Sequence, residues 1–544
     1  MFYGIINKLN LRKNWSVLIL VIFFFWLFFN LLSSHMIYPK EDGLYSGGST
    51  WGDLAIHLTF VNNFLERSFF LRENPVFYGE KMVYPFASDL FSALLVRAGV
   101  SLRWALMGPT LLFVILAIFL MYFVIYKITG SRLGAFFAPF IFFLNGSLTG
   151  FNYFWQDYKA SGLGLKEFTG EMTKSYAHLE DFCLRFSNII SDYILPQRTI
   201  VPGLVLGLIV IYFLWQYWDK RGLADLRKAG LTVAFLPLVH SHTFISMIIV
   251  AFVLAIIELF EDIRSWKNIV QRWLNFAWPV ALIGLPQFAY IYPWGKESFT
   301  RFHFGWMAED ESIWEFWARN LIPHSYIFLF AFWVAELKLK KFYIPFLSLF
   351  ILTNLFLFQP HDYDNMKIMI WWFLGSIIMT AGLIDYLWEK YKKLSLFLII
   401  PMVIGMVLVG SLSVYRESYV SWKLFSFEDI ALAEFVKNNT PKESLFLTTD
   451  QHNHPIPTLA GRQVLMGFRG WLWTHGINYA ERENDIFEMF SGGEESKELI
   501  AKYGVDYAAI DKNQINNFHI NPDFFIENYP LLYESKNFSI YQLN

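Results

Sequence analysis

The sequence WSVLILVIFFFWLFFNLLSSHMI, residues 15–37, decides the fold class of this chain. It is an apolar run longer than the roughly 20 residues that a helix needs to cross a bilayer. Lys8, Arg12 and Lys13 precede it, and it lacks a small-residue cleavage site. We therefore predict an uncleaved first membrane helix whose N-terminus is cytoplasmic.

Composition supports the same class. Hydrophobic residues make up 55% of the chain and charged residues only 17%, whereas soluble domains carry about 25% charged residues. The formal net charge of −2 provides no basic field for binding nucleic acid. The single cysteine, Cys183, excludes an internal disulfide and a cysteine-based metal cluster, and we interpret it as a packing residue rather than a nucleophile.

Further apolar stretches bring the expected number of membrane helices to about eleven. They lie at about 105–126, 133–148, 200–217, 229–240, 243–260, 270–292, 324–336, 342–358, 368–388 and 394–414. Alternation places the short segments 127–132, 219–228, 261–272, 336–341 and 389–393 inside, and each of them holds at least two basic residues. This distribution is what the positive-inside rule requires.

The tracing divides the chain into two domains. Residues 1–414 are the expected polytopic α-helical membrane module, with large external loops at 38–104 and 149–199. Residues 415–544 are the expected extracytoplasmic α/β domain. Its predicted helices are Phe427–Lys437 after a Ser426 cap and Glu494–Tyr503 before Gly504, and its predicted strands are Ser444–Thr449, Gln463–Met466 and Val505–Ile510.

Gly52-Asp53, just beyond the first span, opens the first external loop. An Asp near a helix start is usually a cap, but a carboxylate at the outer membrane surface is also suited to chemistry on a lipid-linked substrate. His57 follows four residues later, so a helix running through Phe64 would place both side chains on one face. Further along, residues 87–100 form an amphipathic stretch suited to the membrane interface.

Polar residues at the outer ends of later spans are candidates for substrate contacts. Gln197-Arg198 adjoins a span, where Arg198 either reaches to the interface or holds a lipid phosphate. His240 and His242 lie between two apolar spans, a position where ionisable residues are usually functional. Because alternate residues of an extended turn point to opposite faces, the two histidines need not serve one site.

The segment Gln359–Lys367 is more polar than a short connection requires. His361, Asp362 and Asp364 are potential ligands for a divalent cation such as Mg²⁺ or Mn²⁺. Alternatively, one of the aspartates pairs with Lys367 or with Arg198. Lys367 itself, at the start of a span, is suited to contact a phosphate.

In the C-terminal domain, Gly467–Trp473 combines two tryptophans with Arg469. It is suited either to stack on a sugar or to pack the domain against the membrane. The chain has no Gly-rich phosphate loop, Gly-x-Ser-x-Gly elbow or His-Glu-x-x-His motif. Nucleotide-driven and serine-hydrolase chemistry are therefore disfavoured.

About eleven spans, the loop opening on Gly52-Asp53, the Tyr84-Pro85 stretch and the external α/β tail resemble the GT-C superfamily of integral-membrane glycosyltransferases. The resemblance covers most of residues 15–414. It implies a polyprenyl-phosphate-linked sugar donor and identifies Asp53 as the expected catalytic residue. Many members add a second acidic residue in the next external loop. Asp157 is the nearest candidate here, although that loop lacks a paired-acid signature.

The predicted function is the inverting transfer of one hexosyl or pentosyl group from a polyprenyl phosphate to an extracytoplasmic glycan, lipid or protein acceptor. Asp53 is the expected general base, and cationic side chains at the membrane surface stabilise the departing phosphate. The residues expected to bind substrate are His57, Asp157, Gln197, Arg198, His240, His242, His361, Asp362, Asp364 and Lys367.

The expected location is the plasma membrane of a bacterium or archaeon, with membrane lipids but no nucleic acid among the partners. Two alternatives remain open at this point: a multi-pass transporter, and a non-catalytic protein that binds lipid-linked glycans during assembly. Transport is disfavoured because the polar residues lie on one face rather than along a path across the bilayer.

Overall fold

The computed structural model describes residues 15–67, 73–292, 300–309 and 311–544, and among these the side chain of Asp362 is not described. The basic N-terminal segment, and with it the prediction that Lys8, Arg12 and Lys13 lie inside, falls outside the described residues. The chain forms two compact units. The first comprises residues 1–33, 109–289 and 299–420, and the second comprises 34–108, 290–298 and 421–544.

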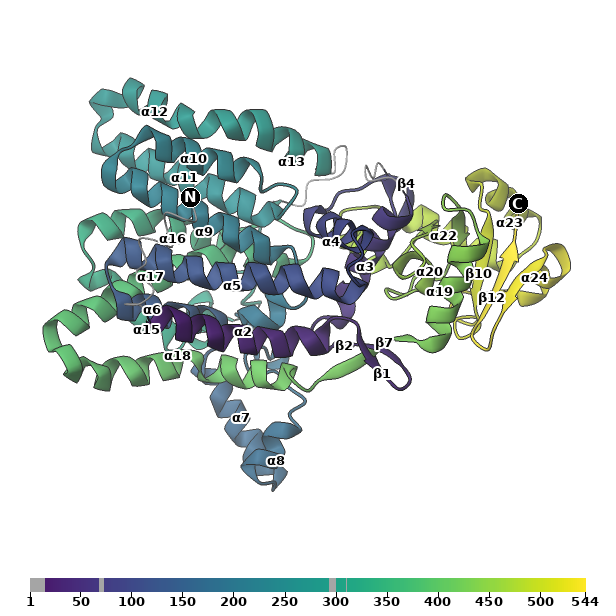
Figure 1. Cartoon of the computed structure of the whole chain (residues 1–544), viewed down its shortest axis with the longest axis horizontal. Coiled ribbons are helices and arrows are strands. Elements are labelled where there is room, and N and C mark those ends of the chain that lie inside the picture. The colour runs from purple at the N-terminus through teal and green to yellow at the C-terminus, as the bar shows by residue number, and fades with distance from the viewer. Residues whose placement is uncertain (1–14, 68–72, 293–299, 310) are drawn as a thin grey trace. The chain divides into compact units, whose positions relative to one another are not determined.

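The first unit is helical, and Figure 1 shows its helices running side by side. Its elements are α2 (Trp15–His35), α5 (Leu102–Thr129), α6 (Arg132–Phe143), α7 (Leu148–Ser161), α8 (Leu165–Gly170), η2 (Glu180–Phe182), η3 (Ile190–Ile194), α9 (Ile200–Lys220), α10 (Leu223–Ala234), α11 (Ser241–Glu261), η4 (Ile263–Ser265), α12 (Trp266–Pro279), η5 (Val280–Gly284), α13 (Leu285–Ile291), β5 (Arg301–Phe302), α14 (Ile313–Asn320), α15 (His324–Val334), α16 (Leu337–Leu355), β6 (Phe356–Leu357), η6 (Asp362–Asn365), α17 (Met366–Tyr391), η7 (Lys392–Ser395) and α18 (Leu396–Glu417). Helices α2, α5 and α13 continue beyond the residues assigned to this unit.

Six helical segments of the described chain are long and apolar enough to cross a membrane, or seven if the bent pair α6 and α7 counts as one span. The protein is thus built as a multi-pass membrane protein, but the predicted count of eleven is not confirmed. Several expected spans are short: α10 has 12 residues and α15 has 11. Residues 363–417 count as one segment although they contain both α17 and α18.

Small residues bring the helices of this unit together. A Cβ added to Gly134 of α6 would lie 2.6 Å from the carbonyl oxygen of Ala381 in α17. One added to Gly410 of α18 would lie 2.1 Å from the carbonyl oxygen of Leu144. Such close backbone approach is the usual means of packing helices in lipid, where apolar burial alone provides no driving force.

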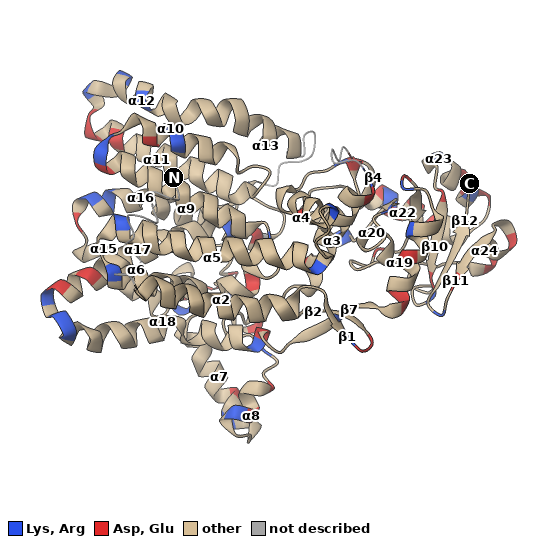
Figure 2. Ribbon diagram, viewed as in Figure 1, with Lys and Arg blue, Asp and Glu red and all other residues tan. Residues whose placement is uncertain are grey.

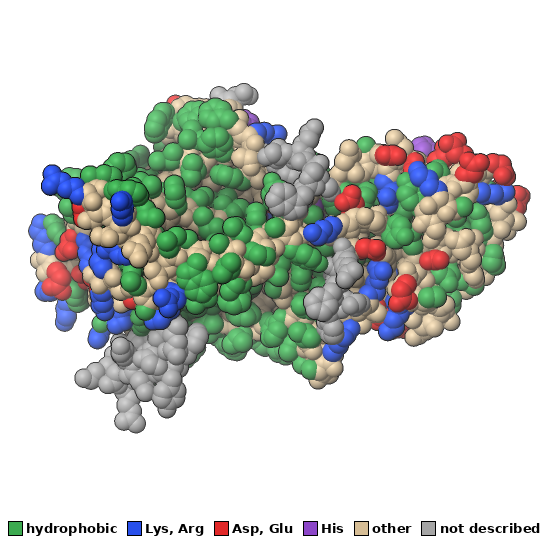
Figure 3. All heavy atoms as spheres, turned by 90° about the horizontal axis from the view of Figure 1, so that it is seen from above, with side chains coloured by type: hydrophobic (Ala, Val, Ile, Leu, Met, Phe, Trp, Pro, Cys, Tyr) green, Lys and Arg blue, Asp and Glu red, His purple; other side chains and the backbone are tan. Residues whose placement is uncertain are grey.

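Charge and apolarity are segregated on the first unit. Figure 2 shows charged residues gathered where α9 meets α10, α11 meets α12 and α17 meets α18, at one end of the helices. Apolar side chains cover the flank that Figure 3 shows, and large ones such as Phe260 and Phe397 are 79% and 77% exposed. An exposed apolar flank between charged ends is what a lipid environment favours.

The second unit combines the first predicted external loop with the C-terminal segment. It contains β1 (Tyr38–Lys40), β2 (Gly43–Gly47), α3 (Trp51–Glu66), β3 (Glu73–Asn74), β4 (Phe77–Lys81), α4 (Ala87–Arg97), β7 (Ser421–Ser426), α19 (Phe427–Asn439), β8 (Leu445–Leu447), α20 (Pro455–Thr458), β9 (Gln463–Val464), α21 (Arg469–Thr474), α22 (Ala480–Ser491), α23 (Glu494–Tyr503), β10 (Tyr507–Asp511), α24 (Pro522–Asn528), β11 (Leu531–Glu534) and β12 (Phe538–Gln542). The expected domain boundary at residue 415 differs from this division, because residues 34–108 and 421–544 belong to one unit. Strand β2 pairs with β1 on one side and β7 on the other.

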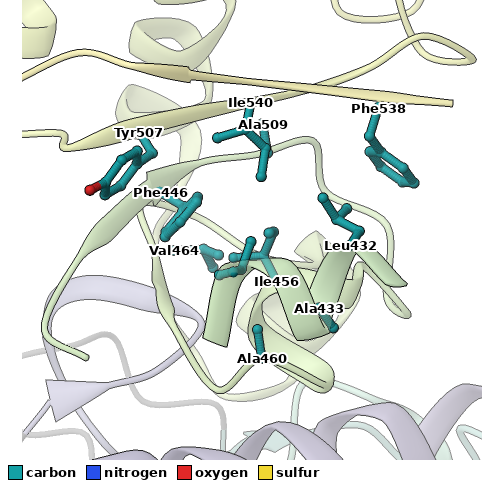
Figure 4. Packing of buried hydrophobic residues seen from close by; sticks show 11 residues of the cluster. Leu432, Ala433, Phe446, Ile456, Ala460, Val464, Tyr507, Ala509, Phe538 and Ile540 are labelled. Carbon is teal, nitrogen blue, oxygen red and sulfur yellow. The ribbon is translucent and has the colours of Figure 1, made fainter. Parts of the chain in front are cut away.

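A five-stranded sheet organises the C-terminal part of the unit, in the order β11-β12-β10-β8-β9. Strand β8 runs parallel to both β9 and β10. Figure 4 shows the core beneath this sheet, where Phe446 and Ile540 of the strands face Leu432 and Ile456 of the covering helices. The predicted Ser426 cap is confirmed, because its side chain and that of Asp429 form a capping box.

Candidate functional site

Within the first unit, the turn before α11 brings two histidine rings together. His240 is the N-cap of α11: its Nδ1 accepts a hydrogen bond from the Thr243 backbone at 3.3 Å and lies 2.7 Å from the Thr243 hydroxyl. The His242 ring lies 5.3 Å from that of His240, centre to centre. The sequence left open whether the two histidines serve one site, and the structure places them side by side.

These rings lie in the field of the ion pair between Lys367 and Asp364. The Lys367 ammonium is 2.6 Å from the Asp364 carboxylate, and both charges act on His242. Of the alternatives that the sequence offered for Asp364, the structure shows pairing with Lys367. Burial lowers the pKa of His240 well below its ordinary value, and His242 and Lys367 lower it further, so this imidazole is neutral at pH 7.

The Nε2 atoms of His240 and His242 are both buried, and neither has a hydrogen-bond partner among the described residues. Buried polar atoms in native proteins are nearly always bonded, and an exception usually has a functional reason. The charge of Lys367 acts on both rings, and we interpret the two atoms as a candidate site for an oxygen-rich ligand. We call His240, His242, Asp364 and Lys367 the histidine–lysine cluster.

Arg198 precedes α9 and is only 3% exposed. An arginine that extends to the membrane surface keeps its guanidinium in water, so this degree of burial favours the alternative in which Arg198 acts inside the protein. The backbone of neighbouring Gln197 donates to the Tyr193 carbonyl at 3.2 Å, which continues the helical turn before α9.

A second network in the same unit is centred on His178. Its Nδ1 lies 3.2 Å from Asp192, and its Nε2 lies 3.1 Å from Glu180 and 2.7 Å from the Tyr363 hydroxyl. Burial lowers the pKa of His178, but its hydrogen bonds with Asp192 and Glu180 and their charges outweigh burial, so that the pKa is raised. Arg185 also pairs with Glu180 at 3.1 Å.

Sequence reasoning did not single out His178, Glu180 or Asp192. The spacing His178-x-Glu180 was a usable signal, because both side chains project from one short loop. Tyr363 precedes Asp364 directly, so this network holds the turn that presents the histidine–lysine cluster.

Three other predicted residues are not part of the histidine–lysine cluster, although the His361 ring lies 6.1 Å from that of Tyr363. Asp157 accepts hydrogen bonds from Lys174 and Tyr176, both at 2.9 Å, and so fastens α7 to the loop that follows it. His361 is exposed, and the side chain of Asp362 is not described. No group of three potential metal ligands occurs among the described residues. Asp364 pairs with the Lys367 ammonium group, and the divalent cation expected at this turn stays a prediction.

Asp53 lies in the second unit, in the first turn of α3. The N-cap of this helix is Thr50, so Asp53 does not occupy the cap position that the sequence allowed as an alternative. The carboxylate is instead placed where the helix dipole favours negative charge. A Cβ added at neighbouring Gly52 would meet no atom within 4 Å, so there is space beside this turn.

His57 lies one turn further along α3, but its partner is a residue that sequence reasoning did not single out. Its Nδ1 is 3.0 Å from the Asp89 carboxylate of α4, and both side chains are at most 1% exposed. The expected helix through Phe64 is confirmed as α3, which places Asp53 and His57 one turn apart, and His57 is buried. An acidic residue in the apolar stretch 87–97 was the signal that could have revealed the pair.

No protein-family model matches the chain, and no curated protein matches its sequence. Solved structures do match. AglB, the oligosaccharyltransferase of Archaeoglobus fulgidus in complex with an inhibitory peptide and a dolichol-phosphate, matches 98% of this chain with 75% of its own, at a TM-score of 0.54 and 12% identity. ArnT from Cupriavidus metallidurans bound to undecaprenyl phosphate matches this chain over 98% of both chains, at a TM-score of 0.52 and 11% identity.

The mycobacterial arabinofuranosyltransferase AftD matches 98% of this chain with 42% of its own, at a TM-score of 0.57 and 12% identity. The chain has the GT-C fold. The fold expected from Gly52-Asp53 and the helical pattern is confirmed. At these identities the similarity concerns the fold, and no subfamily follows from it.

Proposed function

We propose that this GT-C protein is a membrane glycosyltransferase that moves one sugar from a polyprenyl phosphate to an extracytoplasmic acceptor with inversion. The observation that carries the proposal is the match over 98% of the chain to glycosyltransferase structures, one of them bound to undecaprenyl phosphate. The histidine–lysine cluster supports the same proposal, because its residues are suited to the chemistry of transfer from a phosphate donor.

The cluster is suited to the phosphate of the donor. When the bond from the sugar C1 to the phosphate oxygen breaks, the electron pair leaves with the polyprenyl phosphate, and the oxygen gains negative charge. Lys367 offsets this charge, and an N–H of His240 or His242 donates to a phosphate oxygen. Such preorganised donors in a water-poor setting are usually the largest contribution to catalysis.

Asp53 is the proposed general base. The acceptor hydroxyl oxygen forms the new bond to C1 while Asp53 takes its proton, so charge and atoms balance. In the first turn of α3 the helix dipole favours the negative charge of this carboxylate. The acceptor is a glycan, lipid or protein.

The charged ends of the helices support an orientation. The turns between α9 and α10, α11 and α12, and α17 and α18 lie at one end of the helices (Figure 2) and contain basic residues, among them Arg221, Arg264 and Lys392. By the positive-inside rule these turns are cytoplasmic. The segment from Ser421 to Asn544 is then extracytoplasmic, and we assign the chain to the plasma membrane of a bacterium or archaeon.

The test is release of free polyprenyl phosphate by the purified chain in nanodiscs, measured by mass spectrometry over a panel of polyprenyl-phosphate sugars. We expect release by the wild type and at least about 100-fold slower release by Asp53→Asn, the usual scale for loss of a general base. Asp523→Asn is the matched control, because Asp523 is an exposed first-turn residue of α24 in the same unit.

Full activity of Asp53→Asn would show that Asp53 is not the base. If the folded wild type binds polyprenyl-phosphate sugars but releases no polyprenyl phosphate, the transferase hypothesis is wrong. The alternative of a non-catalytic glycan-binding protein would then take its place.

A further inference from the structure

The five-stranded sheet of the second unit has an edge where three parallel strands end together. Strands β9, β8 and β10 run in the same direction, so the loops after Val464, Leu447 and Asp511 emerge on the same side. In sheets of this kind, ligands bind outside the carboxyl ends of the strands. The function of these loops is not explained by Asp53 or by the histidine–lysine cluster.

Side chains tie the three loops to one another. Arg469, after β9, pairs with Asp450, after β8. The amide of Gln451 donates to the Asp511 carboxylate at 2.7 Å, which joins the β8 loop to β10. These contacts join the three loops into one continuous surface.

Polar atoms without partners are buried beside this surface. The Thr448 hydroxyl and the Nε2 atom of His452 are buried and have no hydrogen-bond partner in the described part of the chain. The His452 ring packs 3.9 Å from that of Trp51 and 5.9 Å from that of Phe468, and the residue is only 9% exposed. Burial lowers the pKa of His452 to about 4 against a weaker opposing hydrogen bond with the Trp51 backbone, so the ring is neutral at pH 7.

The exposed border of the surface combines charge with an aromatic face. The Arg469 guanidinium pairs with both Asp450 and Glu483 and remains 44% exposed. Trp473 follows Arg469 by four residues on α21, which places the two on one face of the helix, and it is 48% exposed. Trp471, by contrast, is buried against Phe468. The two tryptophans therefore have different roles, which the sequence did not distinguish.

We propose that this edge, formed by Asp450, His452, Arg469, Trp473 and Glu483, binds a hydroxyl-rich saccharide as the acceptor. The proposal rests on the transferase function proposed above. A carboxylate–guanidinium–carboxylate row offers alternating acceptors and donors to neighbouring hydroxyls, and an indole face packs against the C–H face of a sugar ring. Two carboxylates around one cation disfavour a phosphate, and the exposed charges disfavour an acyl chain.

The same contacts place the acceptor near the proposed base. Trp51 stacks on His452 and begins α3 two residues before Asp53, within the same unit. A saccharide at the edge of the sheet thus lies beside the helical turn that contains Asp53.

The experiment probes the full chain in nanodiscs with a glycan array that spans hexose, pentose, amino-sugar and uronic-acid oligosaccharides, and in parallel with a peptide library. We expect binding to glycans, weakened at least about tenfold by Trp473→Ala and by Arg469→Met, as for exposed aromatic and arginine anchors. Trp473→Phe should retain most of the binding because it keeps an aromatic face. Lys497→Met removes an exposed charge that pairs with Glu494 on α23, and should change nothing.

Release of polyprenyl phosphate to water, without an acceptor, separates this proposal from the preceding one. Lys497→Met, which lies outside the proposed edge, should leave that release unchanged. Release without glycan binding by the wild type would overturn the saccharide site and leave the transferase intact, whereas glycan binding without release from any donor would overturn the transferase alone. Binding to peptides only, or variants that bind glycans like the wild type, would also overturn the saccharide site.

Discussion

Two polar clusters in the helical unit differ in whether their buried polar atoms have hydrogen-bond or ion-pair partners. Glu258 of α11 is 3% exposed, and its carboxylate accepts from the Tyr217 hydroxyl at 2.7 Å and the Trp273 indole at 2.8 Å. It also pairs with Arg221 at 3.3 Å and Arg272 at 2.9 Å. The histidine–lysine cluster instead leaves two buried nitrogens without partners among the described residues.

This difference indicates that the Glu258 cluster stabilises the fold and that the histidine–lysine cluster binds a ligand. A buried charge that is surrounded by donors holds helices together, and its bonds are already formed. A buried polar atom without a partner lowers stability and persists where a ligand completes it. We therefore expect substitutions at Glu258 to act on folding and substitutions at the histidine–lysine cluster to act on turnover.

The largest effect is expected for Glu258→Ala. It removes the charge that α9, α11 and α12 share, which should lower the free energy of unfolding by about 3–5 kcal/mol, as for other broken buried pairs. Thermal unfolding in detergent measures this loss. Glu261→Ala is the control, since Glu261 is 30% exposed and pairs with Lys341 and Arg221 at the surface; its loss should cost at most about 1 kcal/mol.

Lys367→Met should lower the rate of polyprenyl phosphate release by about 100-fold to 1,000-fold, the scale for removing one charge-stabilising donor. Because the substitution also leaves Asp364 unpaired, the double variant Lys367→Met, Asp364→Asn is the control. We expect the double variant to unfold at the wild-type temperature and to remain slow. Recovery of the rate in the double variant would mean that Lys367 only neutralises Asp364.

Gly203→Ala tests whether the position of His240 matters. A Cβ at Gly203 of α9 would lie 2.6 Å from the His240 Cβ, so His240 must shift, at a cost of about 1–3 kcal/mol for overpacking. Release should slow in proportion to the shift. Gly108→Ala in α5 is the control, since a Cβ there meets nothing within 4 Å. Equal rates for the two variants would separate His240 from turnover.

The smallest effect is expected for His178→Gln and concerns pH. Because the pKa of folded His178 is raised above 6.5 by Asp192 and Glu180 despite burial, its contribution to stability is fully present below about pH 6.5. It is lost as the pH rises through the raised pKa. Thermal unfolding across this window should show a fall in the wild type and a flatter profile in His178→Gln, differing by about 1 kcal/mol. If the wild type and His178→Gln show the same pH dependence of thermal unfolding, the His178 network does not contribute to stability.

Local pattern was sufficient for most individual elements. The first span was expected at 15–37 and is found as Trp15–His35, and the charged helix Glu494–Tyr503 ends at Gly504, which adopts the left-handed conformation with φ 64°. Periodicity and capping are encoded by neighbouring residues, so they can be interpreted from the sequence. The strands β8, β9 and β10 also fall within or beside their predicted ranges.

The pairs that define the candidate sites could not be predicted in this way. His57 and Asp89 are 32 residues apart, and His178 and Tyr363 are 185 apart. Nothing in the local sequence of either partner specifies the other, because tertiary packing forms the contact. The span count is not confirmed for a related reason: whether a short apolar helix crosses the membrane depends on the helices that surround it.

The most direct measurement is the affinity of undecaprenyl phosphate for the purified wild type, Lys367→Met and Glu261→Ala, determined by native mass spectrometry together with the melting temperature of each variant. If the histidine–lysine cluster holds the donor phosphate, the wild type and Glu261→Ala bind the lipid alike. Lys367→Met then binds it at least about tenfold more weakly, as expected for loss of a charged hydrogen bond, and stays folded. Equal binding by folded Lys367→Met, or no binding by the wild type, would contradict the assignment.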